Sequence, residues 1–130
     1  MSDNLNVKNI ASDLSISKKS FLDNFFKKQF IKNMNNLEKG HMTISIDGKE
    51  YFIGDKKSNL SCNFKVLHNS FFTLIGSGGL NGAAEAYALG LWECDDIVAL
   101  IRILIRNQNV MNKFDSGIAS LAKPINRSIH

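Results

Sequence analysis

The sequence predicts an α+β domain that begins with an amphipathic helix, continues into a small antiparallel sheet and ends in three or four helices. Three observations lead to this prediction. Apolar residues recur at spacings of three and four between residues 17 and 37, alternate with polar residues between 41 and 66, and return to helical spacing after residue 68. A chain of 130 residues is long enough for one domain with its own core.

The first helix is predicted to start near Ser17, where a serine can cap it, and to end at Gly40. Its apolar residues lie on one side, and lysines lie on the other. Residues 1–15 are rich in Asn, Ser and Asp, and we expect them to form a flexible lead-in. The domain itself is predicted to span residues 16–123. The apolar positions of the helix are Phe21, Leu22, Phe25, Phe26 and Phe30.

The sheet is predicted from three short segments with alternating apolar residues. Residues 41–46 alternate, and Asp47-Gly48 is a strong signal for a two-residue hairpin turn. Residues 49–54 would form the returning strand, and residues 62–66 alternate again as a third strand.

The second half of the chain is predicted to be helical. A short helix near residues 68–75 could be capped by Asn69 or Ser70, and a second would cover residues 83–92. Asp95 and Asp96 would open a third helix, with their charges at its positive end. Residues 97–105 of that helix are apolar nearly all round, so we expect them to be buried or covered by a partner. A last helix is predicted from about residue 111 to 123, before Pro124.

The glycine-rich stretch 76–82 suggests a phosphate-binding loop, but its context argues against one. Gly76 and Gly78 supply two glycines of a dinucleotide fingerprint, whereas position 81 is Asn, and no second strand with an acid follows. A nucleotide P-loop also needs a Lys that is missing here.

The glycines are instead expected to serve helix packing. Gly76, Gly78 and Gly79 would let one helix end and another begin at a sharp angle. Gly82 would let helices approach each other closely, and Gly90 would lie either at such a contact or in a turn that needs special backbone angles.

Composition sets wider limits. The net charge of +4 permits an anionic partner without requiring one. Cys62 and Cys94 form no CxxC pattern and are interpreted as buried thiols. His41 and His68 have no neighbours of the types that bind metals, so no metal site is expected. No signal peptide is visible, and the longest apolar stretch, 97–105, is far shorter than the roughly 20 residues that span a bilayer. A cytoplasmic location is therefore expected.

The segment 79–96 closely resembles the glycine-rich segment in the N-terminal domain of cyclopropane-fatty-acyl-phospholipid synthases. The resemblance extends over roughly residues 38–110 and includes the Asp47-Gly48 turn, Ile53-Gly54 and the paired Phe71-Phe72. The motif positions, expected to be structural or to serve docking, are Gly79, Gly82, Glu85, Tyr87, Gly90, Trp92, Asp95 and Asp96.

The resemblance implies a function for the domain. Enzymes of that family transfer a methylene group from S-adenosylmethionine to an unsaturated acyl chain of a membrane phospholipid. Their cofactor and catalytic groups belong to a C-terminal methyltransferase domain that these 130 residues lack, so no catalytic or cofactor-binding residue is expected here. The N-terminal domain would engage anionic phospholipid at the inner face of the membrane, contact the methyltransferase domain and support a homodimer. Residues 124–130 would begin the interdomain linker.

The first helix is the candidate lipid-binding element, because aromatic side chains could enter the interface while lysines meet phosphates. The alternative is an ordinary core-facing helix with solvated lysines. Glu85 and Tyr87 could contact a head group or the catalytic domain, or pair locally and pack in the core, and Trp92 is expected to anchor the core. The candidate lipid-binding residues are Phe25, Phe26, Lys27, Lys28, Phe30 and Lys32.

Two other functions stay open. The chain could be a stand-alone protein–protein interaction module that uses the apolar helix 97–105. Nucleic-acid binding is the weakest hypothesis, because acids are scattered among the lysines and no recognised nucleic-acid motif is present, so no such partner is expected.

Overall fold

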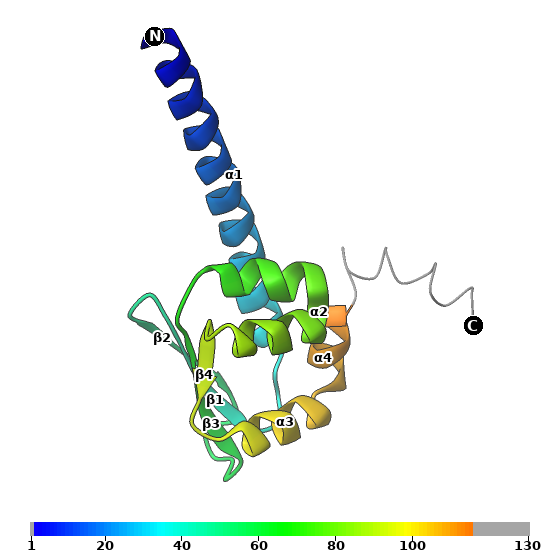
Figure 1. The fold of residues 1–130 in the computed structure, drawn as a ribbon. Helices are drawn as coiled ribbons and strands as arrows, with labels where there is room; N and C mark the ends of the chain where they lie inside the picture. Colours follow the sequence, from blue (N-terminus) through cyan, green and yellow to red (C-terminus); the bar gives the residue numbers. More distant parts are fainter. Residues whose placement is uncertain (1, 116–130) are drawn as a thin grey trace, which may run out of the picture.

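The computed structural model describes residues 2–115, and the side chains of residues 18–115. It is an α+β fold, which confirms the predicted class: a helix, then strands, then helices (Figure 1). The elements are α1 (Ser2–Met34), β1 (His41–Ile46), β2 (Lys49–Gly54), β3 (Ser61–Val66), α2 (Ser70–Ala88), β4 (Trp92–Cys94), α3 (Ile97–Arg106) and α4 (Gln108–Asp115).

The four strands form one mixed sheet in the order β2-β1-β3-β4. The hairpin at Asp47-Gly48 is confirmed, since β1 and β2 pair antiparallel and Ile46 lies opposite Lys49. The sheet was predicted to be antiparallel and is mixed, because β3 pairs parallel to β1 on the side away from β2, whereas β1–β2 and β3–β4 pair antiparallel. Alternation along a strand predicts which face is buried, but it does not say which neighbour the strand will choose.

The sheet buries one face only. Along β3, the side chains of Cys62, Phe64 and Val66 are buried, while Asn63 and Lys65 between them are exposed. The helices cover the buried face, and α1 extends well beyond the body of the domain (Figure 1).

Helix α1 differs from its predicted limits at both ends. It begins at Ser2, so residues 2–15, expected as a lead-in, are helical. It ends at Met34 and not at Gly40, because the backbone after it forms hydrogen bonds with Asn107 in place of helical ones. The backbone N–H groups of Glu38 and Lys39 both donate to Asn107 Oδ1, at 3.0 and 3.1 Å.

Asn107 is a buried polar residue whose side-chain amide forms hydrogen bonds through both its oxygen and its nitrogen. Besides accepting those two bonds, its Nδ2 donates to Lys39 O and to Ile103 O, each at 2.7 Å. It therefore ties the corner between α3 and α4 to the segment that links α1 to β1. Sequence analysis missed this residue.

Helix α2 consists of two helical halves joined at a kink, as the two helices predicted for this region required, although the second half ends at Ala88 and not at residue 92. It is kinked at Gly79, whose φ of 63° and ψ of −143° suit only glycine. The sharp angle predicted from the glycines is thus confirmed at Gly79, but Gly76 and Gly78 keep helical geometry. After the kink the chain folds back so closely that a Cβ on Gly82 would collide with Leu74 O, as the close-approach prediction required.

Gly90 ends α2 in a left-handed turn, with φ of 74°. The N–H of Gly90 donates to Tyr87 O and that of Leu91 to Ala86 O, which is the bonding pattern of a Schellman motif. Nothing lies within 4 Å of a Cβ built there, so Gly90 serves the turn and not a close helix contact. The reversal sends Trp92 into β4, where sequence analysis had placed it at the end of a helix.

Candidate functional site

The predicted lipid-binding residues of α1 do not act as one surface. Phe26 and Phe30 lie in the hydrophobic core and are 7% and 5% exposed. The ring of Phe26 occupies space beside Gly76 that a Cβ there would fill. These two aromatic residues hold α1 against the domain, so they cannot enter a membrane while the fold is intact.

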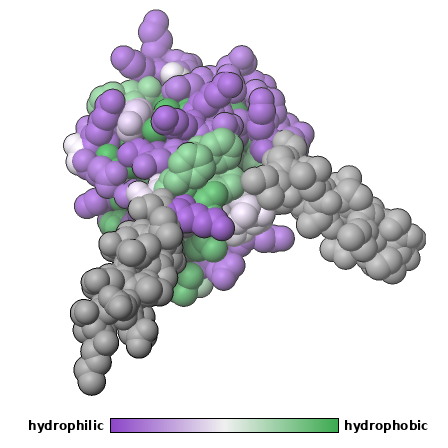
Figure 2. All heavy atoms as spheres, turned by 90° about the horizontal axis from the view of Figure 1, so that it is seen from above, coloured by the Kyte–Doolittle hydropathy of each residue, from purple (hydrophilic) through white to green (hydrophobic). Residues whose placement is uncertain are grey.

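The other members of that set are accessible. Phe25 is 44% exposed, and Lys28 and Lys32 are also exposed, whereas Lys27 forms an ion pair with Asp47 at 3.2 Å. Seen from above in Figure 2, the molecule has an apolar area beside hydrophilic side chains. The helix thus retains an exposed apolar and basic stripe, smaller than the sequence predicted.

The residues of the family-like motif mostly have structural roles. Besides the glycines described above, Trp92 is buried, stacks on Phe64 with ring centroids 4.8 Å apart, and donates from Nε1 to Ala83 O at 2.8 Å. Tyr87 is about half exposed and lies against Trp92, with ring centroids 4.8 Å apart. Glu85 is exposed, and its carboxylate has no partner among the side chains of residues 18–115.

Asp95 and Asp96 fix the start of α3 in different ways. Asp96 is the N-cap, and its carboxylate accepts from the Ala99 N–H at 3.0 Å, as the sequence predicted for an acid at this end. Asp95 turns to β3 and accepts from the N–H and Nδ2 of Asn63 at 2.7 and 2.8 Å. The hydrogen bond from the backbone of Asn63, with that from its side chain, lowers the pKa of Asp95.

An apolar cavity of about 410 Å³ lies between the sheet and helices α2, α3 and α4. Its inner wall includes Phe30, Phe64, Phe71 and Trp92 from the core. Ligand pockets in proteins typically measure about 300–1,000 Å³ and are lined mainly by apolar side chains. The cavity is therefore of a size and character that suit a small apolar ligand.

The mouth of this cavity lies between the second half of α2 and α3. Lining residues that are exposed come from these two helices: Ala84 and Tyr87 on α2, and Ile101 and Ile105 on α3. The kink at Gly79 separates this half of α2 from the half that packs on α1. The Asp115 carboxylate of α4 accepts from the N–H of Leu80 at 3.3 Å, just after the kink.

Helix α3 presents an uncovered apolar face beside this mouth. Its inner side buries Ala99, Leu100 and Ile103, while Val98, Ile101 and Ile105 are between 51% and 58% exposed. Arg102 and Arg106 follow the two exposed isoleucines, and neither pairs with a carboxylate within the described part of the chain. The inner side of this helix is therefore buried as predicted, whereas its outer side is exposed.

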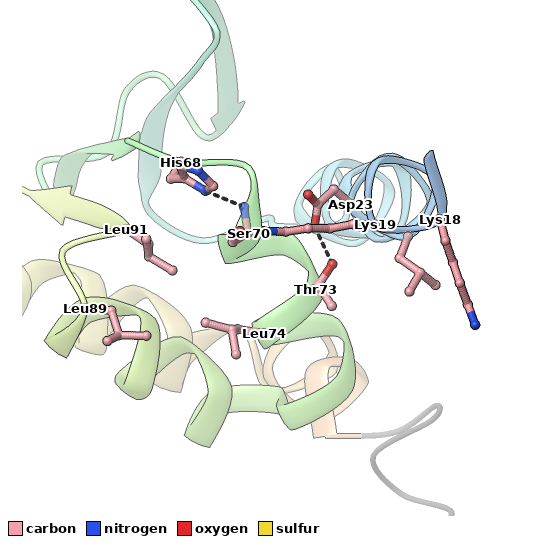
Figure 3. A pocket seen from close by; sticks show the side chains of 10 residues that line it. Lys18, Lys19, Asp23, His68, Ser70, Thr73, Leu74, Leu89 and Leu91 are labelled. Carbon is pink, nitrogen blue, oxygen red and sulfur yellow. Dashed lines mark hydrogen bonds between the residues drawn. The ribbon is translucent and has the colours of Figure 1, made fainter. Parts of the chain in front are cut away.

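A second, more open hollow of about 640 Å³ lies between α1 and the start of α2 (Figure 3). Leu74, Leu89 and Leu91 line it together with Lys18 and Lys19. Two hydrogen bonds join polar groups of the lining: Thr73 Oγ1 donates to Asp23 Oδ1 at 2.5 Å, and the Ser70 N–H donates to His68 Nδ1 at 3.0 Å. This hollow offers a ligand less enclosure than the apolar cavity.

The thiols show no sign of catalytic activation. Burial, reinforced by the neighbouring Cys94, raises the pKa of Cys62 well above its usual range, and burial also raises the pKa of Cys94. Both are therefore protonated thiols at neutral pH, a form that is a poor nucleophile. The described residues contain no cluster of three or more metal-ligating side chains, and no helix among them is long and apolar enough to cross a bilayer.

Comparison of the chain with protein-family models, with curated proteins and with solved structures finds no match. The likeness to cyclopropane-fatty-acyl-phospholipid synthases thus depends on the sequence motif alone.

Proposed function

We propose that this domain docks on anionic phospholipid membranes through the outer face of α3, as an accessory domain of an enzyme similar to cyclopropane-fatty-acyl-phospholipid synthases. The observation that carries the proposal is the face itself, where Val98, Ile101 and Ile105 are exposed beside Arg102 and Arg106. The catalytic partner and the homodimer are proposed on the resemblance of residues 79–96.

The face suits an anionic lipid surface for two reasons. Inserting aliphatic side chains removes apolar area from water, which is worth up to about 1.5–3 kcal/mol for each fully buried side chain. An arginine near an anionic surface adds about 1 kcal/mol. Arg102 and Arg106 lie about 100° around the helix from Ile101 and Ile105, and their long side chains can reach head groups beside the inserted isoleucines.

The test is sedimentation of the protein with vesicles of phosphatidylglycerol or of phosphatidylcholine. We expect binding to the anionic vesicles, weaker binding with added salt, and little binding to the zwitterionic ones. The variant Ile101→Ser/Ile105→Ser should lose binding while keeping the circular dichroism spectrum of the parent protein. The matched control is Phe21→Ser/Phe25→Ser, which alters exposed residues of α1.

The outcomes separate the alternatives. Loss of binding in the α1 control, with the α3 variant unaffected, would move the membrane contact to α1. Failure of the parent protein to bind anionic vesicles at low salt would refute the proposal. In that case the uncovered face of α3 would favour the protein–protein interaction module.

A further inference from the structure

We infer that the cavity between α2, α3 and α4 holds one acyl chain of an anionic phospholipid. The preference for an alkyl chain follows from the cavity alone, whereas the phospholipid as its source rests on the proposed function.

The lining excludes ligands that need hydrogen bonds. Among the described residues that line the cavity, only Tyr87 and Trp92 carry a side-chain nitrogen or oxygen, and Trp92 Nε1 is already bonded to Ala83 O. A nucleotide, sugar or carboxylate inside would leave its polar groups without partners, which costs free energy for each buried group. An alkyl chain has no such groups and gains from contact with the surrounding rings and aliphatic side chains.

The volume is also sufficient for an extended apolar group. A cavity of about 150 Å³ lined by similar residues is enough to bind benzene. The present cavity, at about 410 Å³, leaves room for a considerably longer hydrocarbon.

The charge beside the mouth suits an anionic head group on the occupant. Ile101 and Ile105 belong both to the cavity lining and to the outer face of α3, so the mouth opens on the proposed membrane contact. Arg102 and Arg106 flank these residues without a carboxylate partner in the described structure. The arginines can bind a phosphate outside the cavity while one acyl chain of the same lipid enters the cavity.

Trp92 provides a direct measurement, because it is the only tryptophan in the chain and lines the cavity. A brominated acyl chain quenches tryptophan fluorescence at contact. We expect vesicles of phosphatidylglycerol with brominated acyl chains to quench Trp92 strongly, compared with unbrominated vesicles that bind the protein equally.

A larger side chain in the lining tests the location. Ala84→Phe should abolish most of the quenching without changing sedimentation with the vesicles, because Ala84 lines the mouth. The matched control, Ala88→Phe, alters an exposed alanine of α2 outside the lining and should leave the quenching unchanged. Leu104→Phe, which also fills the lining, serves if Ala84→Phe does not fold.

A second arm separates this inference from the proposed function. The parent protein is titrated with a soluble brominated fatty acid below its micelle concentration. Vesicle binding without quenching of Trp92 in either arm would overturn the inference and leave the proposed function standing. Saturable quenching by the fatty acid alone, without vesicle binding, would overturn the phospholipid source and the proposed function together, leaving a site for free fatty acids.

Discussion

Helices α1 and α3 both carry large apolar side chains beside basic ones, but they meet different surroundings. In α1, Phe30 lies among aromatic rings, with centroids 5.3 Å from Phe71 and 5.6 Å from Phe72. In α3, Ile101 and Ile105 remain about half exposed although the helix packs on the sheet through its other side.

The difference shows that residue pattern and burial are separate questions. An amphipathic pattern predicts that a helix has an apolar side, but the partner surface decides which residues that side can bury. The first half of α2 gives α1 such a surface, because Gly76 leaves room for the Phe26 ring. The outer side of α3 receives no comparable cover from the described residues.

The largest effect is expected where α1 meets the core. Phe30→Ala should lower the free energy of unfolding by about 3–5 kcal/mol, because it removes a buried ring and leaves a cavity. Urea unfolding measures this loss. Phe21→Ala, which alters a residue that is 68% exposed on the same helix, should change stability by no more than about 0.5 kcal/mol. Similar losses in both variants would show that α1 does not pack as described.

An intermediate effect is expected at the kink that divides α2 between the two regions. Gly79→Ala should destabilise by about 1–3 kcal/mol, because its backbone angles suit glycine and a Cβ would collide with Asp115. Gly78→Ala, one residue earlier, should stabilise by roughly 0.5–1 kcal/mol, since that position is helical and open. Thermal unfolding should therefore shift in opposite directions. A shift of the same sign in both variants would contradict the kink.

The smallest effect on stability is expected on the outer side of α3. Ile101→Ser should change the free energy of unfolding by about 0.5 kcal/mol or less, because the side chain is half exposed. Its buried neighbour provides the contrast, since Leu100→Ser should cost about 2–5 kcal/mol through the lost packing. If urea unfolding finds the two variants equally destabilised, a surface that covers Ile101 must exist in solution.

The sequence predicted the class of fold, the Asp47-Gly48 hairpin and the start of α3 after Asp95 and Asp96, because each depends on interactions between residues close together in the chain. The parallel pairing of β1 with β3 could not be predicted in this way, since it depends on where β3 returns after a loop. The same limit applies to Asn107, whose polar side chain gives no local sign that it bonds residues nearly 70 positions earlier.

The candidate site was predicted less well than the fold. The sequence identified Trp92 as a core residue and residues 97–105 as an unusual apolar helix, and both belong to the cavity region. It could not show the cavity itself, which forms where residues from all four helices and from strands β1, β3 and β4 meet. It also assigned Phe26 and Phe30 to a membrane contact, because the same amphipathic pattern is found in helices that pack on a protein core and in helices that bind a bilayer.

Helix α3 is held at both ends, and this has a consequence for how the proposed acyl chain would enter the cavity. Asp95 ties the start of the helix to β3, and Asn107 ties its end to the segment before β1. The backbone beside the mouth therefore has little freedom to swing outward. On the α3 side of the mouth, rotation of the Ile101 and Ile105 side chains, which takes picoseconds to nanoseconds at exposed positions, is the motion that remains to widen the entrance. We therefore expect entry of the proposed acyl chain past α3 to need side-chain rotation and no displacement of that helix.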